Sequence, residues 1–113
     1  AIVEENVSQA MEVARAVRES ISLVEHITGH TIDVMSLSYN RMMNHIKYMA
    51  ARAMTGEVLK LDLNEYMEQK FPASFQIATT VCRHLEQHLN IKLADIEIGY
   101  LDMHIERVYA DEK

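Results

Sequence analysis

The sequence predicts an all-α domain, and its composition supports that prediction in two ways. Apolar residues make up 49% of the 113 positions, with only three glycines and one proline to interrupt helices. Met, Ala, Glu and Leu, which favour helices, are abundant. A chain of this length suits a single core. We therefore expect residues 1–113 to form one compact five-helix bundle with short loops.

Apolar residues at helical spacing define two long helices in the first half of the chain. The first should cover about residues 4–27, and Gly29 is placed to end it. The second should cover about residues 36–55, with Ser36 or Ser38 as its N-cap and Gly56 after its last turn.

The second half of the chain predicts one short helix and two longer ones. Asp62 and Glu65 have the spacing of a capping box, which opens a helix ending near residue 69. Pro72 suits the first turn of a fourth helix, which should reach about residue 89 and stop at a left-handed Asn90. The fifth helix should cover about residues 95–110, with acidic residues in its first turn.

Charge and cysteine content narrow the classes of function. The net charge of −6 and the lack of Lys/Arg clusters argue against direct nucleic-acid binding by this domain. No apolar run reaches membrane-spanning length, so we expect no membrane insertion. The lone Cys82 forms no internal disulfide, which fits a cytoplasmic protein. Because the chain starts at Ala1, directly in a helical pattern, we expect it to be part of a larger protein.

Two histidines stand at positions suited to a reversible modification. His45 and His104 each lie where the apolar stripe of a predicted helix meets its charged stripe. A ring at this boundary packs against the fold while one nitrogen stays within reach of a partner. The alternative is an ordinary packing role on an amphipathic helix.

Two other histidine pairs raise the question of metal binding. His84 and His88 are four residues apart, as are His26 and His30, and such pairs can bind metal from one helix. Neither a carboxylate-x-x-His motif nor a second cysteine completes a site in the sequence. We therefore expect no metal and no cofactor.

Three short motifs, taken in order, point to a family. His45 is followed by an isoleucine, by Arg52 seven positions later and then by Gly56. Phe-Pro-x-Ser-Phe occupies residues 71–75, and Glu-x-x-Tyr-Leu-x-x-His-Ile-Glu-Arg occupies residues 97–107. Together they resemble the PTS regulation domain, the histidine-phosphorylated module of bacterial transcriptional antiterminators and related activators. The match covers nearly the whole chain. The closing motif looks more like the second such domain of a beta-glucoside/glucose-type antiterminator.

The resemblance implies a fold, partners and a mode of action. The fold would be two antiparallel helix pairs, first with fourth and second with fifth, and a short third helix across them. Members form homodimers and receive phosphate from the phosphocarrier protein HPr or a sugar-specific enzyme II. Phosphate then shifts the full-length protein between an RNA-binding state and an inactive one. By position, His45 and His104 match the phosphorylated histidines of the family.

Three arginines are candidates to bind the phosphoryl oxygens. Arg41 and Arg52 lie on the polar side of His45, and Arg107 lies close to His104. A guanidinium offers charge-assisted hydrogen bonds to phosphate. The alternative is that these are ordinary solvated arginines.

Three more residues are candidates to support the rings. Glu97 lies two turns before His104 on nearly the same face, where it is placed to orient that ring. Tyr48 and Tyr100 are placed to line the histidine site, although amphipathic packing explains them equally well.

We therefore predict a regulatory domain that is not an enzyme and whose phosphate donors are the enzymes. Two alternatives remain. A two-component phosphotransfer domain is also a helical bundle, but usually carries one active histidine. A helical metal-binding or di-metal domain is the other, and the sequence lacks the inward Glu-x-x-His pairs that it needs.

Overall fold

The computed structural model describes the backbone of residues 2–110 and the side chains of residues 8–110, and this part of the chain is all-α. Its elements, in order, are α1 (Ile2–Thr28), α2 (Leu37–Thr55), α3 (Asn64–Lys70), α4 (Pro72–Leu89) and α5 (Ile96–Ala110). The predicted fold class is confirmed, and the predicted helix limits lie within a few residues of those observed.

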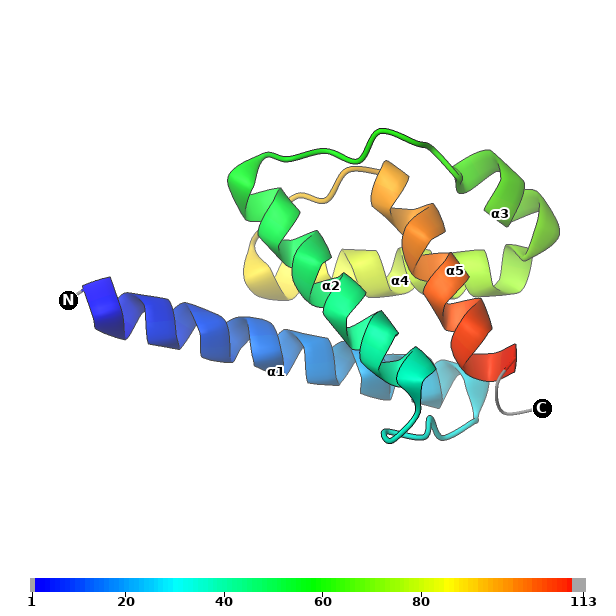
Figure 1. The fold of residues 1–113 in the computed structure, drawn as a ribbon, viewed down its shortest axis with the longest axis horizontal. Coiled ribbons are helices and arrows are strands. Elements are labelled where there is room, and N and C mark those ends of the chain that lie inside the picture. The colour runs from blue at the N-terminus through cyan, green and yellow to red at the C-terminus, as the bar shows by residue number, and fades with distance from the viewer. Residues whose placement is uncertain (1, 111–113) are drawn as a thin grey trace.

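The four long helices form two antiparallel pairs that cross each other (Figure 1). One pair is α1 with α4 and the other is α2 with α5, as predicted. The short α3 packs against α5 and α4, and α4 also contacts α5 where the pairs cross. The N-terminal part of α1 projects beyond the rest of the bundle (Figure 1). None of the helices within residues 2–110 is both long and apolar enough to cross a membrane.

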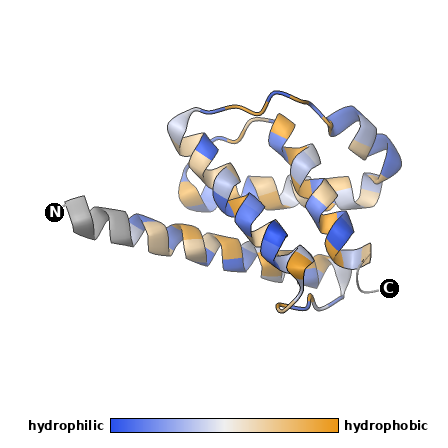
Figure 2. Ribbon diagram, viewed as in Figure 1, coloured by the Kyte–Doolittle hydropathy of each residue, from blue (hydrophilic) through white to orange (hydrophobic). Residues whose placement is uncertain are grey.

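A single core fills the space between the pairs. Hydrophobic and hydrophilic positions alternate along the long helices (Figure 2), as expected of helices with one buried face. The fully covered side chains include Val17, Val24, Met42, Ile46, Met49, Val81, Leu85, Leu101 and Ile105. Ile46 directly follows His45 and Ile105 directly follows His104, so the core fixes the position of each histidine on its helix.

Three residues at helix ends behave as predicted. Ser36 caps α2, its hydroxyl accepting the Tyr39 N–H at 3.1 Å. Gly56 ends α2 with φ +81°, and Asn90 ends α4 with φ +53°. Both adopt the left-handed conformation that a helix C-terminus favours.

The start of α3 differs from the prediction. The helix begins at Asn64, and Asp62 accepts the Asn64 N–H at 2.8 Å without closing a capping box. The reason is a contact between α3 and α5. The Asn64 side chain instead accepts the Gly99 N–H at 2.8 Å and donates to the Asp95 carbonyl at 2.6 Å. Asn64 therefore caps the first turn of α5, whose N–H groups have no partner within their own helix.

This contact requires a residue without a side chain at position 99. A Cβ atom there would lie 2.6 Å from Asn64 Oδ1 and 3.1 Å from the Asn64 backbone nitrogen. We expect Gly99→Ala to push α3 from α5 and to lower the free energy of unfolding by about 1–3 kcal/mol. Urea unfolding measures it, with the exposed Ser22→Ala as control, expected within about 0.5 kcal/mol of the parent. Equal stability of the two variants would contradict this close approach.

Candidate functional site

The structure places His45 and His104 side by side. His45 lies in the middle of α2 and His104 in the second half of α5, and their ring centroids are 4.7 Å apart with an angle of 32° between the planes. Both residues are partly buried at the contact between the two helices. This distance could not be predicted from the sequence, because it depends on how α2 and α5 are aligned.

The register of α2 against α5 explains why the two rings meet. Arg52 lies seven residues after His45, and Glu97 lies seven residues before His104. In an antiparallel pair, two residues displaced equally in opposite directions along the chain face each other again. Arg52 Nε donates to Glu97 Oε2 at 2.8 Å, and Arg52 Nη2 donates to Glu97 Oε1 at 2.6 Å. One ion pair and one ring pair thus belong to the same alignment of the helices.

The structure pairs Glu97 with Arg52, whereas the sequence led us to expect that it orients the His104 ring. Both oxygens of the Glu97 carboxylate accept hydrogen bonds from Arg52, and the Glu97 side chain is only 3% exposed. Hydrogen bonding to Glu97 raises the pKa of Arg52. In this arrangement Arg52 joins the end of α2 to the start of α5, and its guanidinium is mostly covered rather than presented to solvent.

The His45 ring is held in its neutral form. Burial is the main cause that lowers its pKa to about 3, and neighbouring His104 and Arg52 act in the same direction. Its Nε2 atom is buried and has no hydrogen-bond partner among the described residues. The Tyr100 ring lies nearly parallel to it, with centroids 6.3 Å apart and 16° between the planes.

The neutral form of the His104 ring is also favoured, and two exposed arginines lie near this ring. Burial lowers its pKa first, followed by the positive charges of Arg107 and Arg41. Both arginines are exposed. A neutral imidazole has a free lone pair and is the nucleophilic form of histidine. Nearby cations that disfavour an imidazolium favour an anionic group bound to the same ring.

The remaining candidates divide according to their exposure. The structure gathers His45, His104 and Tyr100 into one group of rings, with Arg41 and Arg107 close enough to act on His104. Tyr48, in contrast, is 64% exposed on α2. Cys82 is fully buried, and burial raises the pKa of its thiol to about 12, as expected for a cysteine packed in the core.

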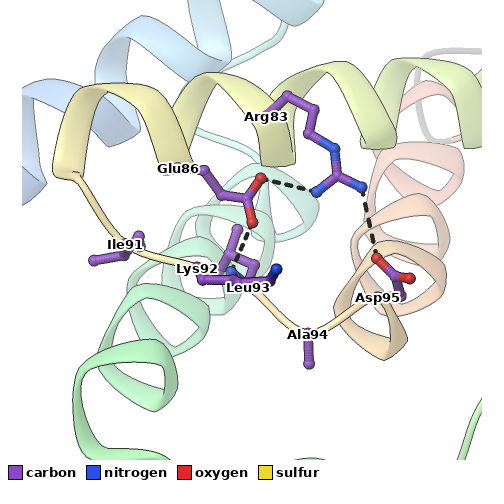
Figure 3. Close-up of a pocket in the computed structure, with 7 residues that line it drawn as sticks. All are labelled: Arg83, Glu86, Ile91, Lys92, Leu93, Ala94 and Asp95. Atoms are coloured by element: carbon purple, nitrogen blue, oxygen red, sulfur yellow. Dashed lines mark hydrogen bonds and ion pairs between the residues drawn. The ribbon is translucent and has the colours of Figure 1, made fainter.

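A hollow of about 570 Å³ lies away from the histidine pair, along the loop that joins α4 to α5 (Figure 3). There the Glu86 carboxylate accepts the Leu93 N–H at 2.8 Å and pairs with Arg83 at 2.8 Å. Arg83 also reaches Asp95 at 3.5 Å, as the dashed lines of Figure 3 show. These contacts tie the loop to α4, which gives the polar groups of the hollow a structural explanation.

The fold and site define a small all-α domain with a partly buried histidine pair between two antiparallel helices. Comparison with known families identifies it. The PRD domain family matches residues 18–108, so this chain belongs to the PRD domain family. Membership of this family argues against the alternative of a two-component phosphotransfer domain.

Several curated relatives are similar to this chain. Protein GlcT of Staphylococcus saprophyticus is 31% identical over 91 residues, which is 79% of this chain and 32% of the relative. The "GlcA/glcB genes antiterminator" of Staphylococcus carnosus is 28% identical over the same shares. Transcription antiterminator LicT of Bacillus subtilis is 24% identical over 107 residues, 92% of this chain and 39% of LicT. The chain thus spans about a third to two fifths of the length of these relatives.

The buried neutral His45 predicts a dependence of stability on pH. Its pKa is lower in the folded chain than in the unfolded chain, so the unfolded state binds the proton more readily as the pH falls below about 6.5. The stability that the neutral ring contributes is present above that pH and is lost progressively towards pH 3. Between pH 7.5 and 4.5 the free energy of unfolding should fall for both proteins. We expect this fall to be about 2–3 kcal/mol smaller for His45→Gln than for the parent.

Urea unfolding across this pH range measures the difference. The exposed His26 provides the control, because His26→Gln removes an imidazole without altering the α2–α5 contact. Parallel pH profiles for the parent and His45→Gln would contradict a buried neutral ring.

Proposed function

We propose that this PRD accepts phosphate on His45 and His104 and thereby controls a transcriptional antiterminator of which it is one part. The observation that carries the proposal is the pair of neutral imidazoles, 4.7 Å apart, beside the exposed cations Arg41 and Arg107. Two of the relatives described above are named antiterminators, and this supports the wider regulatory role.

The chemistry follows from the state of the rings. The lone pair of a neutral imidazole nitrogen attacks the phosphorus of a donor phosphohistidine. A nitrogen–phosphorus bond forms on the domain while the corresponding bond of the donor breaks, and the donor imidazole leaves. Arg41 and Arg107 can then receive the phosphoryl oxygens by charge-assisted hydrogen bonds. The donors in this proposal are the phosphocarrier protein HPr and a sugar-specific enzyme II.

His104 is the better placed of the two to react first in this arrangement. Exposed arginines lie near His104, whereas the Nε2 atom of His45 is buried and has no hydrogen-bond partner within residues 8–110. Transfer to Nε2 of His45 therefore requires α2 and α5 to shift. This requirement links the modification of His45 to a change in the structure of the domain.

Charge explains how phosphate acts as a switch in the proposed mechanism. Each phosphate adds roughly −1.5 to −2 charges. Two unit charges about 5 Å apart repel by about 3 kcal/mol at an effective dielectric constant near 20. Phosphates on both facing rings would therefore separate α2 from α5 unless cations intervene. A difference of roughly 1–3 kcal/mol between two arrangements of a dimer is enough to shift their populations.

The remaining parts of the proposal concern the whole regulator. We propose that the domain forms a homodimer in the cytoplasm and that RNA is bound by another domain of the full-length protein. The net charge of −6 supports this division, because an acidic domain is poorly suited to grip a phosphate backbone.

The proposed function predicts which residues receive phosphate. On incubation with phosphoenolpyruvate, enzyme I and HPr, with or without a cognate enzyme II, we expect acid-labile phosphate on His45 and His104. Mass spectrometry under neutral conditions locates it. The double variant His45→Ala, His104→Ala should lose the label, and His26→Ala, which alters an exposed histidine of α1, should retain it. Label confined to other residues would refute the site assignment.

The proposed function also predicts a role for the exposed arginine beside His104. One charge-assisted hydrogen bond contributes about 1.5–3 kcal/mol, so we expect Arg107→Ala to slow phosphate transfer to His104 by roughly tenfold or more. Rapid-quench measurement of the initial rate tests this. Arg18→Ala removes an exposed arginine from α1 and should leave the rate close to that of the parent. Equal rates for the two variants would mean that Arg107 does not assist the transfer.

A further inference from the structure

We infer that Glu19, His84 and His88 form a binding site for one divalent transition-metal ion, with Zn²⁺ as the best match. Each of these residues offers one ligand atom, and the three atoms lie within 4.8 Å of one another. His84 Nε2 is 3.4 Å from Glu19 Oε2, and His88 Nδ1 is 3.8 Å from the same oxygen. This site lies between α1 and α4, the helix pair that does not carry His45 and His104.

The two histidines are arranged for chelation by their helix. Residues four apart share one face of an α-helix, and the His84 and His88 rings lie 4.1 Å apart between centroids. α1 packs along this face of α4 and brings Glu19 opposite the two rings. The sequence reveals the histidine pair but not the carboxylate, because Glu19 comes from a distant part of the chain.

The separations suit a tetrahedral metal ion. Zinc binds imidazole nitrogen at about 2.0–2.1 Å and carboxylate oxygen at about 2.0–2.2 Å, so its tetrahedral ligand atoms lie roughly 3.4 Å apart. The two distances to Glu19 Oε2 already lie within about half an ångström of this value. All three ligand atoms lie within 4.8 Å of one another, and we expect side-chain rotations to bring them to the tetrahedral separation.

One of the proposed ligand atoms is a buried nitrogen that makes no hydrogen bond within residues 8–110. His84 Nε2 is buried, and no hydrogen-bond partner is found for it in the described part of the chain. Glu19 Oε2 lies 3.4 Å from it, beyond the usual length of a good hydrogen bond. A buried polar atom without a partner costs free energy. A metal ion held between Glu19 and His84 would satisfy the nitrogen.

The surroundings leave room for a fourth ligand. A hollow of about 200 Å³ adjoins the cluster and is lined by Glu12, Arg15, Ala16, Glu19 and His88. Three protein ligands with an open fourth position are the arrangement in which zinc keeps a bound water. The ligand set of two imidazoles and one carboxylate suits Zn²⁺, Co²⁺, Ni²⁺ or Cu²⁺, whereas Mg²⁺ and Ca²⁺ prefer oxygen ligands alone.

Metal titration of the purified protein tests the site, after removal of bound metal with a chelator. We expect one Co²⁺ ion per domain to give the visible absorption of a four- or five-coordinate site, and Zn²⁺ to displace it. We also expect Zn²⁺ at about a hundred times its Kd to raise Tm by roughly 10 °C, because the ion links α1 to α4. Mg²⁺ should do neither.

Single variants assign the ligands. Glu19→Gln and His88→Gln change side chains that are 41% and 49% exposed, so both should fold, which circular dichroism verifies. Each should weaken Co²⁺ binding at least tenfold and abolish most of the rise in Tm. His26→Gln is the matched control, because His26 and His30 are the other histidines four residues apart. It should bind Co²⁺ like the parent.

Three outcomes would overturn the inference. The first is the absence of a Co²⁺ spectrum and of a rise in Tm for the parent, which would leave Glu19 as an ordinary ion-pair partner of the two histidines. The second is equal weakening by His26→Gln and His88→Gln. The third is binding that His45→Gln abolishes and His88→Gln retains, which would place the ion at the other histidine pair.

Discussion

The ion pair between Arg52 and Glu97 is the contact on which the histidine site depends. It is largely buried, and it holds two charges whose removal from water is costly unless each meets its partner with good geometry. Such a pair is poor evidence for high stability, but it strongly disfavours any other alignment of α2 and α5. A shift of one helix by a single residue, a rise of about 1.5 Å, would break both hydrogen bonds. The alignment that remains is the one that brings His45 against His104.

This constraint gives the proposed switch its physical basis. The unmodified domain combines an attractive ion pair with two neutral rings, and neither opposes the contact between α2 and α5. A phosphate on either ring would add charge at a partly buried position two helical turns from Glu97 or from Arg52. The ion pair and the phosphate would then favour different arrangements of the same two helices. A domain with two competing arrangements of similar free energy responds to a small change at one site.

Local chemistry predicted most of the fold, whereas the errors came from contacts between distant elements. Ser36, Gly56 and Asn90 act within one turn of the helix ends that they determine, so their roles were readable from the sequence. The role of Asn64 was not, because its side chain caps α5 rather than its own helix. Glu97 and His104 share a face of one helix, which suggested a contact between them. The partner that Glu97 meets is Arg52, and only the register of two helices reveals it.

The same reasoning explains why each helix pair holds a polar cluster that single-helix patterns did not predict in full. On α1 and α4, Glu19 lies against His84 and His88, and on α2 and α5, Arg52 and Glu97 accompany His45 and His104. A cation bound by the first cluster would draw α1 towards α4, because all three ligands share one positive centre. A phosphate on the second would add negative charge between α2 and α5. Since α4 also packs against α5, the two helix pairs share a contact through which a change in one can alter the packing of the other.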